Sequence, residues 1–237
     1  MGEVSAAPGG VRGGIVTGHQ GRDGQKRGNA SGVIQGFDVE TGELRFAWDM
    51  MRPDRDGLPP EGETYTPGTP NMWTTATGDE ALGLVYLPMG NSAADYHSST
   101  RRPLEKQYST SLVALDVTTG KPRWHFQTVH NDVWDFDLGS QATLIDFPTA
   151  GGVVPAVMLP SKQGDIYVFD RATGRLLHGV EERPVPTTCL VEASYRPPTH
   201  PFPPLSTPRN PNLTARATCR MSPLPQILCR ITLTPTP

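Results

Sequence analysis

Cysteine is scarce in this chain and occurs only near its end. The 237 residues include three cysteines, Cys189, Cys219 and Cys229, and no C-x-x-C pair is present. Cysteine-based zinc sites need closely spaced pairs, so a zinc centre of that kind is excluded. An odd number of cysteines cannot pair completely within one chain, so the cysteines do not indicate a redox compartment.

Long apolar runs and a strong charge of one sign are also missing. A membrane-spanning helix needs about 18 or more consecutive apolar residues, and the chain has no such run. Residues 2–10, GEVSAAPGG, lack the charged and apolar regions of an export signal. The formal net charge is -3, with acids and bases interspersed. We therefore expect no membrane span or targeting segment in this chain, and no nucleic-acid partner.

Sustained helical periodicity is absent as well, and the chain instead repeats one short phrase. Each copy is an apolar, strand-like run, then Asp-x-x-Thr-Gly, then a ring eight residues after the Asp. The copies are Asp38 to Gly42 with Phe46, Asp116 to Gly120 with Trp124, and Asp170 to Gly174 with His178. Asp and Thr can hydrogen-bond the turn backbone and Gly accepts a positive φ, which predicts a tight β-hairpin. Such repeats are typical of modular all-β arrays such as propellers.

The repeats are unevenly spaced, which predicts loop insertions. Their first residues lie 78 and then 54 positions apart, whereas a four-stranded propeller blade takes about 40 to 50 residues. Residues 51–73 and 91–108, rich in Gly, Pro and polar residues, are the expected insertions, and long ordered loops often carry function. Proline becomes frequent from about residue 184. We therefore divide the chain into a strand-rich part, 1–186, and a Pro-rich, degenerate or poorly ordered segment, 187–237.

Several long motifs stand in one order along the chain: GVIQGFDVETGELRFAWDM, TPNMWTTATGDEALGLVYLPMGNS, YSTSLVALDVTTGKPRWHFQTVHNDVWDFDLGSQATL and PSKQGDIYVFDRATG. Together they closely resemble the membrane-bound, pyrroloquinoline quinone (PQQ)-dependent dehydrogenases of the glucose, quinate and shikimate type. The resemblance implies an eight-bladed β-propeller on the periplasmic face of a bacterial inner membrane. It also implies oxidation of a sugar or polyol, glucose above all, with electrons passed to ubiquinone.

Three copies of the repeat are fewer than eight blades require. The resemblance therefore implies a fragment of about three four-stranded antiparallel blades, without the membrane anchor and the remaining blades of the family. An open array exposes edge strands and half of a cofactor pocket, so we expect the isolated chain to be inactive.

The segment VHNDVWDFDLGSQ concentrates acidic residues. Oxidising an alcohol through an orthoquinone needs a base for the hydroxyl proton, and the resemblance makes Asp135 that catalytic base. On a strand Asp135 and Asp137 would share one face, and their repulsion would raise one pKa. The alternative is that these carboxylates only cap turns of a loop.

Lys162 and Trp73 are the expected cofactor-binding residues. The resemblance places the Lys162 ammonium against the quinone oxygens, where it would stabilise negative charge, and Trp73 beside the cofactor plane. Without the resemblance, Lys162 would be an ordinary solvated lysine and Trp73 a packing residue. Trp124 follows the repeated turn and is interpreted as a structural residue.

A divalent cation, Ca2+ or Mg2+, is implied by the same resemblance and takes oxygen ligands. Asn91, in the Gly-Asn pair of LPMGNS, and Asp23 are the expected metal ligands. The surroundings of Asp23 depart from the family pattern, because Gly21 and Arg22 stand where apolar residues are expected. A simple turn residue is the alternative for Asp23.

A non-catalytic propeller scaffold would show the same three turns. It has no reason to keep Trp73, the Val133–Asp137 segment and Lys162 together, so we favour the enzyme. The sequence leaves open which sugar or polyol is oxidised.

Overall fold

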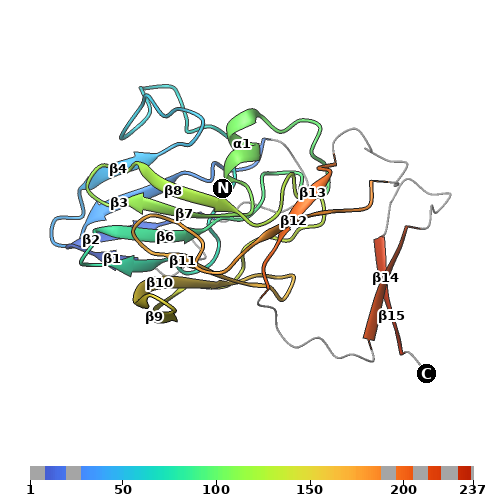
Figure 1. Cartoon of the computed structure of the whole chain (residues 1–237). Coiled ribbons are helices and arrows are strands. Elements are labelled where there is room, and N and C mark those ends of the chain that lie inside the picture. Colours follow the sequence, from blue (N-terminus) through green and yellow to red (C-terminus); the bar gives the residue numbers. More distant parts are fainter. Residues whose placement is uncertain (1–8, 20–27, 188–195, 205–212, 220–228, 236–237) are drawn as a thin grey trace.

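The computed structural model describes residues 9–19, 28–187, 196–204, 213–219 and 229–235. Within them, three antiparallel sheets stack one over another (Figure 1). The first contains β1 (Gly9–Val11), β2 (Gly14–Thr17), β3 (Ile34–Asp38) and β4 (Leu44–Trp48). The second contains β5 (Thr77–Asp79), β6 (Leu84–Pro88), β7 (Ser111–Asp116) and β8 (Pro122–Gln127). The third contains β9 (Thr143–Thr149), β10 (Gly152–Pro160) and β11 (Ile166–Asp170).

Helix in the described part of the chain is confined to one short element, and two hairpins follow the sheets. The helix is α1 (Pro103–Tyr108), which starts at a proline and ends after six residues. The hairpins are β12 (Glu181–Pro184) with β13 (Thr199–Phe202), and β14 (Leu213–Cys219) with β15 (Cys229–Pro235). No helix among the described residues is long and apolar enough to cross a membrane. The all-β partial propeller is confirmed, and the sheets form an open array. The boundary at residue 186 stays a prediction, and β12 pairs with β13 across it.

The three Asp-x-x-Thr-Gly turns have the same local structure. In the second copy, Asp116 Oδ1 accepts the Thr118 and Thr119 N–H groups at 2.9 and 3.0 Å. Gly120 has φ 65° and donates its N–H to the Asp116 carbonyl at 2.8 Å. The first and third copies repeat these bonds with matching distances. The residue types of the motif therefore determine the turn, as predicted.

The second sheet is buried on both faces because it lies between the other two. Successive side chains of a strand point to opposite faces. One buried cluster joins the second sheet to the first, and its members on β6 and β7 are Val85, Leu87, Val113 and Leu115. The other joins it to the third, through Leu84, Tyr86, Leu112 and Ala114. The continuous apolar runs of β6 and β7 follow from this two-sided burial.

Antiparallel order separates the turns from the long connections. The repeated turns follow β3, β7 and β11, so they leave the sheets at one end, whereas connections after even-numbered strands leave at the other. The connections after β4, β6, β8 and β10 carry, in that order, the predicted site residues Trp73, Asn91, Asp135 and Lys162. The fold therefore brings residues from four connections to one end of the stack.

Candidate active site

Lys162 is the centre of the candidate site. Its Nζ donates a hydrogen bond to the Asp135 main-chain carbonyl at 3.1 Å. The same Nζ lies 3.7 Å from the carboxylates of both Asp135 and Asp137. It also lies 5.4 Å from the centroid of the Trp73 ring, within the range of a cation–π contact. The structure thus brings together three of the predicted residues, from three different connections.

The connection between β8 and β9 is shaped by a buried carboxylate, Asp132. Its oxygens accept hydrogen bonds from Trp134 N at 2.9 Å, from Phe136 N at 2.8 Å and from the Thr110 hydroxyl at 2.9 Å. Burial raises the pKa of Asp132, while these hydrogen bonds oppose the shift. Turn capping, the alternative considered for the acidic residues of this segment, is the role of Asp132.

The expected strand through Asp135 and Asp137 is wrong. Asp135 has φ 62° and the segment forms no strand. This left-handed conformation is uncommon outside glycine, but aspartate tolerates it better than most residues. Both carboxylates nevertheless face Lys162, because the loop that Asp132 shapes turns them toward the connection between β10 and β11.

The two carboxylates differ in their surroundings. The Asp137 side chain is 14% exposed and the Asp135 side chain 33%. Burial, and next the charge of Asp135, raise the pKa of Asp137 to about 7, against the opposing effect of Lys162. The raised pKa therefore belongs to Asp137, and burial is its main cause, with the predicted repulsion from Asp135 second. Asp137 Oδ1 also accepts the Asn91 main-chain N–H at 2.6 Å.

The Trp73 ring is packed against backbone that only glycine allows so close. A Cβ added to Gly139 would lie 2.7 Å from Trp73 Cη2, and one added to Gly90 would lie 3.0 Å from Trp73 Cδ1. The neighbouring Asn71 Oδ1 is buried and accepts no hydrogen bond from the residues that the structure describes. A flat indole, a nearby cation and an unsatisfied acceptor are features that fit a planar ligand with polar edges.

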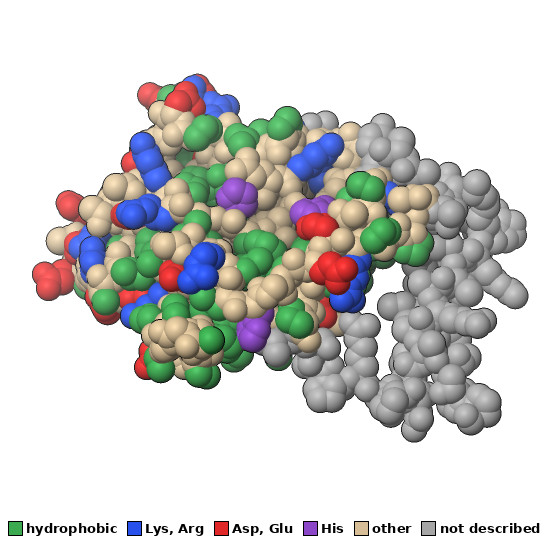
Figure 2. All heavy atoms as spheres, in the orientation of Figure 1, with side chains coloured by type: hydrophobic (Ala, Val, Ile, Leu, Met, Phe, Trp, Pro, Cys, Tyr) green, Lys and Arg blue, Asp and Glu red, His purple; other side chains and the backbone are tan. Residues whose placement is uncertain are grey.

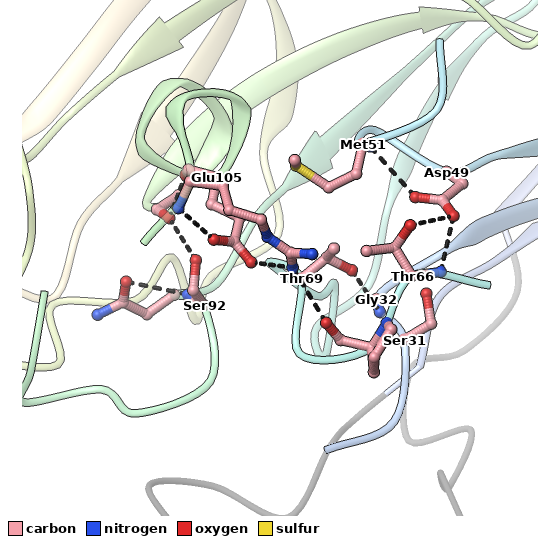
Figure 3. A network of polar contacts seen from close by, with 12 residues as sticks. Ser31, Gly32, Asp49, Met51, Thr66, Thr69, Ser92 and Glu105 are labelled. Carbon is pink, nitrogen blue, oxygen red and sulfur yellow. Dashed lines mark hydrogen bonds and ion pairs between the residues drawn. The ribbon is translucent and has the colours of Figure 1, made fainter. Parts of the chain in front are cut away.

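Asn91 is buried, with 2% of its surface exposed. Its Nδ2 donates to the carbonyls of Asp95 at 3.2 Å and Asp132 at 3.1 Å, while Oδ1 accepts the Ser92 N–H at 3.0 Å. Ser92 is itself buried and hydrogen-bonded, as Figure 3 shows. Asn91 therefore joins two connections of the site.

The metal prediction is only partly open to the structure, because Asp23 lies outside the described residues. Among the residues that are described, no group of three or more His, Cys, Asp or Glu side chains is arranged to hold a metal ion. The Asn91 Oδ1 accepts the Ser92 N–H and keeps a second lone pair. Its chemistry therefore fits a hard cation, and a role as metal ligand stays a prediction.

Two histidines, His130 and His200, join the β12–β13 hairpin to the β8–β9 connection. His200 Nδ1 accepts the His130 main-chain N–H at 3.1 Å, and His130 Nε2 lies 3.0 Å from Glu182 Oε1. The His200 ring meets Trp134 edge-to-face at 5.3 Å. Burial, and next the nearby His130, lower the pKa of His200 to about 4.

On the molecular face drawn in Figure 2, acidic and basic side chains are interspersed, as the sequence indicated.

Sequence reasoning missed the two glycines of this site, and it singled out the acidic segment without separating the roles of its carboxylates. Asp132 and Asp137 lie in the acidic segment that was singled out, and Gly90 and Gly139 lie in motifs that were quoted. A glycine that allows close backbone approach has no distinctive local pattern, so only the packing on Trp73 identifies it.

Comparison with known proteins gives several matches. The family model of the PQQ glucose/ethanol/alcohol dehydrogenase β-propeller domain matches residues 2–236. The glycerol dehydrogenase large subunit of Gluconobacter oxydans (strain 621H) is 48% identical over 93% of this chain and 30% of that protein. The quinoprotein glucose dehydrogenase of Escherichia coli (strain K12) is 41% identical over 85% of this chain and 25% of that protein.

Solved structures agree with these matches. A quinohemoprotein alcohol dehydrogenase of Pseudomonas putida HK5 has a TM-score of 0.60 at 26% identity, covering 85% of this chain and 31% of that chain. The chain thus spans less than a third of the length of the relatives named here.

Proposed function

Because this chain belongs to the family of PQQ glucose/ethanol/alcohol dehydrogenase β-propellers, we propose that the protein oxidises a sugar or polyol with PQQ as its cofactor. The observation that carries this proposal is the convergence of Asp135, Lys162 and Trp73. A carboxylate, a cation and a flat aromatic face are the groups that quinone-dependent alcohol oxidation requires.

Asp135 is the proposed general base. Its side chain is a third exposed, so it can reach a substrate hydroxyl, whereas Asp137 is more deeply placed. Two neighbouring carboxylates in different surroundings can thus take different roles, and Asp135 removes the hydroxyl proton.

Lys162 and Trp73 are the proposed cofactor-binding residues. When bound, PQQ accepts the two electrons and the hydrogen of the alcohol carbon. Lys162 supplies a positive charge that lies within 3.7 Å of both carboxylates and can also meet quinone oxygens. Trp73 offers an indole face whose position is fixed by Gly90 and Gly139.

Asn91 and Asp23 are the proposed ligands of Ca2+ or Mg2+. A hard cation there would act as a Lewis acid beside the cofactor. The support from the described residues is the Asn91 amide oxygen, which the Asp132 carbonyl and the Asp95 carbonyl hold in one orientation through Nδ2.

The substrate, the electron acceptor and the location are also proposals. The E. coli relative is a glucose dehydrogenase and the Gluconobacter relative a glycerol dehydrogenase, so glucose and glycerol are the two substrates to compare. By family resemblance, electrons pass to ubiquinone at the periplasmic face of a bacterial inner membrane. The isolated chain is proposed to be inactive, because its three sheets form an open array.

The test uses the full-length protein that carries this sequence, loaded with PQQ and with Ca2+ or Mg2+. Dye-linked oxidation of glucose or glycerol should appear only with both added. Asp135→Asn should lower turnover by about 10² to 10⁴-fold, the usual contribution of a general base. Asp146→Asn, the same change at an exposed position of β9, is the matched control. Cofactor-independent or undetectable oxidation of both substrates would contradict the proposal.

A further inference from the structure

We propose that Asp137 is a positioning residue that fixes the Lys162 ammonium relative to Asn91, and so joins the cofactor lysine to the expected metal ligand. This inference rests on the proposed function. It goes beyond it because Asp137 contacts neither substrate nor cofactor in this role and acts through its two neighbours.

The two oxygens of Asp137 have different partners. Oδ1 accepts the Asn91 main-chain N–H at 2.6 Å, and Oδ2 lies 3.7 Å from Lys162 Nζ. With 14% of its surface exposed, the Asp137 side chain has little freedom to leave this arrangement. Asp137 lies in the β8–β9 connection, which links the second and third sheets. Its carboxylate reaches Asn91 in the β6–β7 connection of the second sheet and Lys162 in the β10–β11 connection of the third.

Lys162 needs such a partner more than an arginine would. A lysine carries a point charge on a flexible four-carbon stem and has no planar fork to orient it. Among the described residues, the hydrogen bond that Lys162 donates runs to the Asp135 main-chain carbonyl at 3.1 Å. A single hydrogen bond does not determine the direction of an ammonium, and a second charge on another side restricts it.

Asp135 cannot supply that restriction throughout the proposed reaction. Its carboxylate also lies 3.7 Å from Lys162 Nζ, but as the base it gains a proton and loses its charge. Asp137 is tied by Oδ1 to the backbone of Asn91, so its place does not depend on the state of the substrate. The arrangement separates proton transfer, at Asp135, from the holding of Lys162, at Asp137.

The Asn91 end of this link is rigid. The Asn91 side chain is 2% exposed and bonds the Asp95 and Asp132 carbonyls. A carboxylate that is anchored to this residue holds Lys162 against a fixed point rather than against a mobile loop tip. The position of the Lys162 ammonium relative to the Asn91 amide oxygen is consequently fixed.

The test compares Asp137→Asn with Asp146→Asn in the full-length protein at about pH 8.5, where the Asp137 carboxylate, whose pKa is raised to about 7, is ionised. The Asp137→Asn side chain would keep an oxygen for the Asn91 N–H but would present an amide nitrogen to Lys162. In the protein without PQQ, acylation of Lys162 by an amine-specific reagent, followed by mass spectrometry, should become about two- to fivefold faster in Asp137→Asn, the range for losing a partly exposed ion pair. The other lysines and Asp146→Asn should keep the wild-type rates. Unchanged labelling of Lys162 would overturn the proposal.

Cofactor affinity gives the second readout. Asp137→Asn should weaken PQQ binding about tenfold, a usual effect of removing a supporting partner, with little change in the melting temperature. In a Lys162→Gln background the same change should have almost no effect, because Asp137 acts through Lys162. An equal loss in both backgrounds would overturn the positioning role. If the wild-type protein binds no PQQ, while Lys162 is still labelled faster in Asp137→Asn, the result would contradict the proposed function and support the positioning role.

Discussion

The Trp124 ring packs directly against Gly174, a residue of the next repeat. A Cβ added to Gly174 would lie 2.6 Å from Trp124 Cδ2. Phe46 and Gly120 repeat this relationship one sheet earlier, at 2.7 Å. In the first two repeats, the ring therefore rests on the turn glycine of the following repeat. This contact explains why the motif contains both a glycine and a ring eight residues after its aspartate.

Gly120→Ala should destabilise the protein by more than backbone strain alone. A Cβ at Gly120 would meet Phe46 and would also occupy a φ of 65°. We expect a loss of about 3 kcal/mol in the free energy of unfolding, measured with urea. Gly42→Ala is the control, because Gly42 has φ 72° but no atom within 4 Å of the added Cβ. That variant should lose about 1 kcal/mol. Equal losses would contradict the packing role of Gly120.

Substitution by leucine should affect stability at Trp124 and cofactor binding at Trp73. Trp124 contacts Tyr86 and Phe169, with ring centroids 5.7 Å away in each case. Trp124→Leu should therefore lower stability by about 2 to 3 kcal/mol. Trp73→Leu should mainly weaken PQQ binding, measured by titration of the full-length protein. A large loss of stability at Trp73, with PQQ affinity intact, would make Trp73 a packing residue.

Gly139→Ala should disturb the site without destabilising the sheets. The added Cβ would lie 2.7 Å from Trp73 Cη2 and 3.7 Å from Lys162 Cε. Displacing the indole should lower PQQ affinity about tenfold. A misplacement of about 1 Å can cost up to about 10²-fold in rate. Gly151→Ala, whose new Cβ would have its nearest neighbour at 3.9 Å, is the control. Wild-type affinity in Gly139→Ala would show that Trp73 can shift freely.

His200 should make the protein sensitive to acid. The folded state lowers the pKa of His200 to about 4 from an ordinary value of 6.5, so it favours the neutral ring. The stabilisation is present above about pH 6.5 and is lost as the pH falls toward about 4, by at most about 3 kcal/mol. The charges of His130 and Glu182 also act on this ring.

The measurement for His200 is urea unfolding at several pH values between about 4 and 7. His200→Asn keeps an oxygen that can accept the His130 N–H but cannot titrate in this range. Its stability should decline less with acid than that of the wild type. Parallel declines would assign the acid sensitivity to other groups.

The repeated turns and the sheets were largely predictable because their causes are local. The strand-like runs that precede the three repeated turns form β3, β7 and β11. Asp116 and Gly120 build their turn from bonds between neighbours in the chain. Asp135 failed as a strand residue because its conformation depends on Asp132, which holds the loop from within.

The sequence by itself determined the turns, the all-β class and, through resemblance, the family and its expected residues Trp73, Asn91, Asp135 and Lys162. It did so because turn chemistry and alternation act between residues close in the chain. Only the tertiary structure decided which of these residues meet, and that Asp137 lies between Asn91 and Lys162. The physical reason is that antiparallel order sends alternate connections to one end of the stack, where residues from different sheets come within a few ångströms of each other.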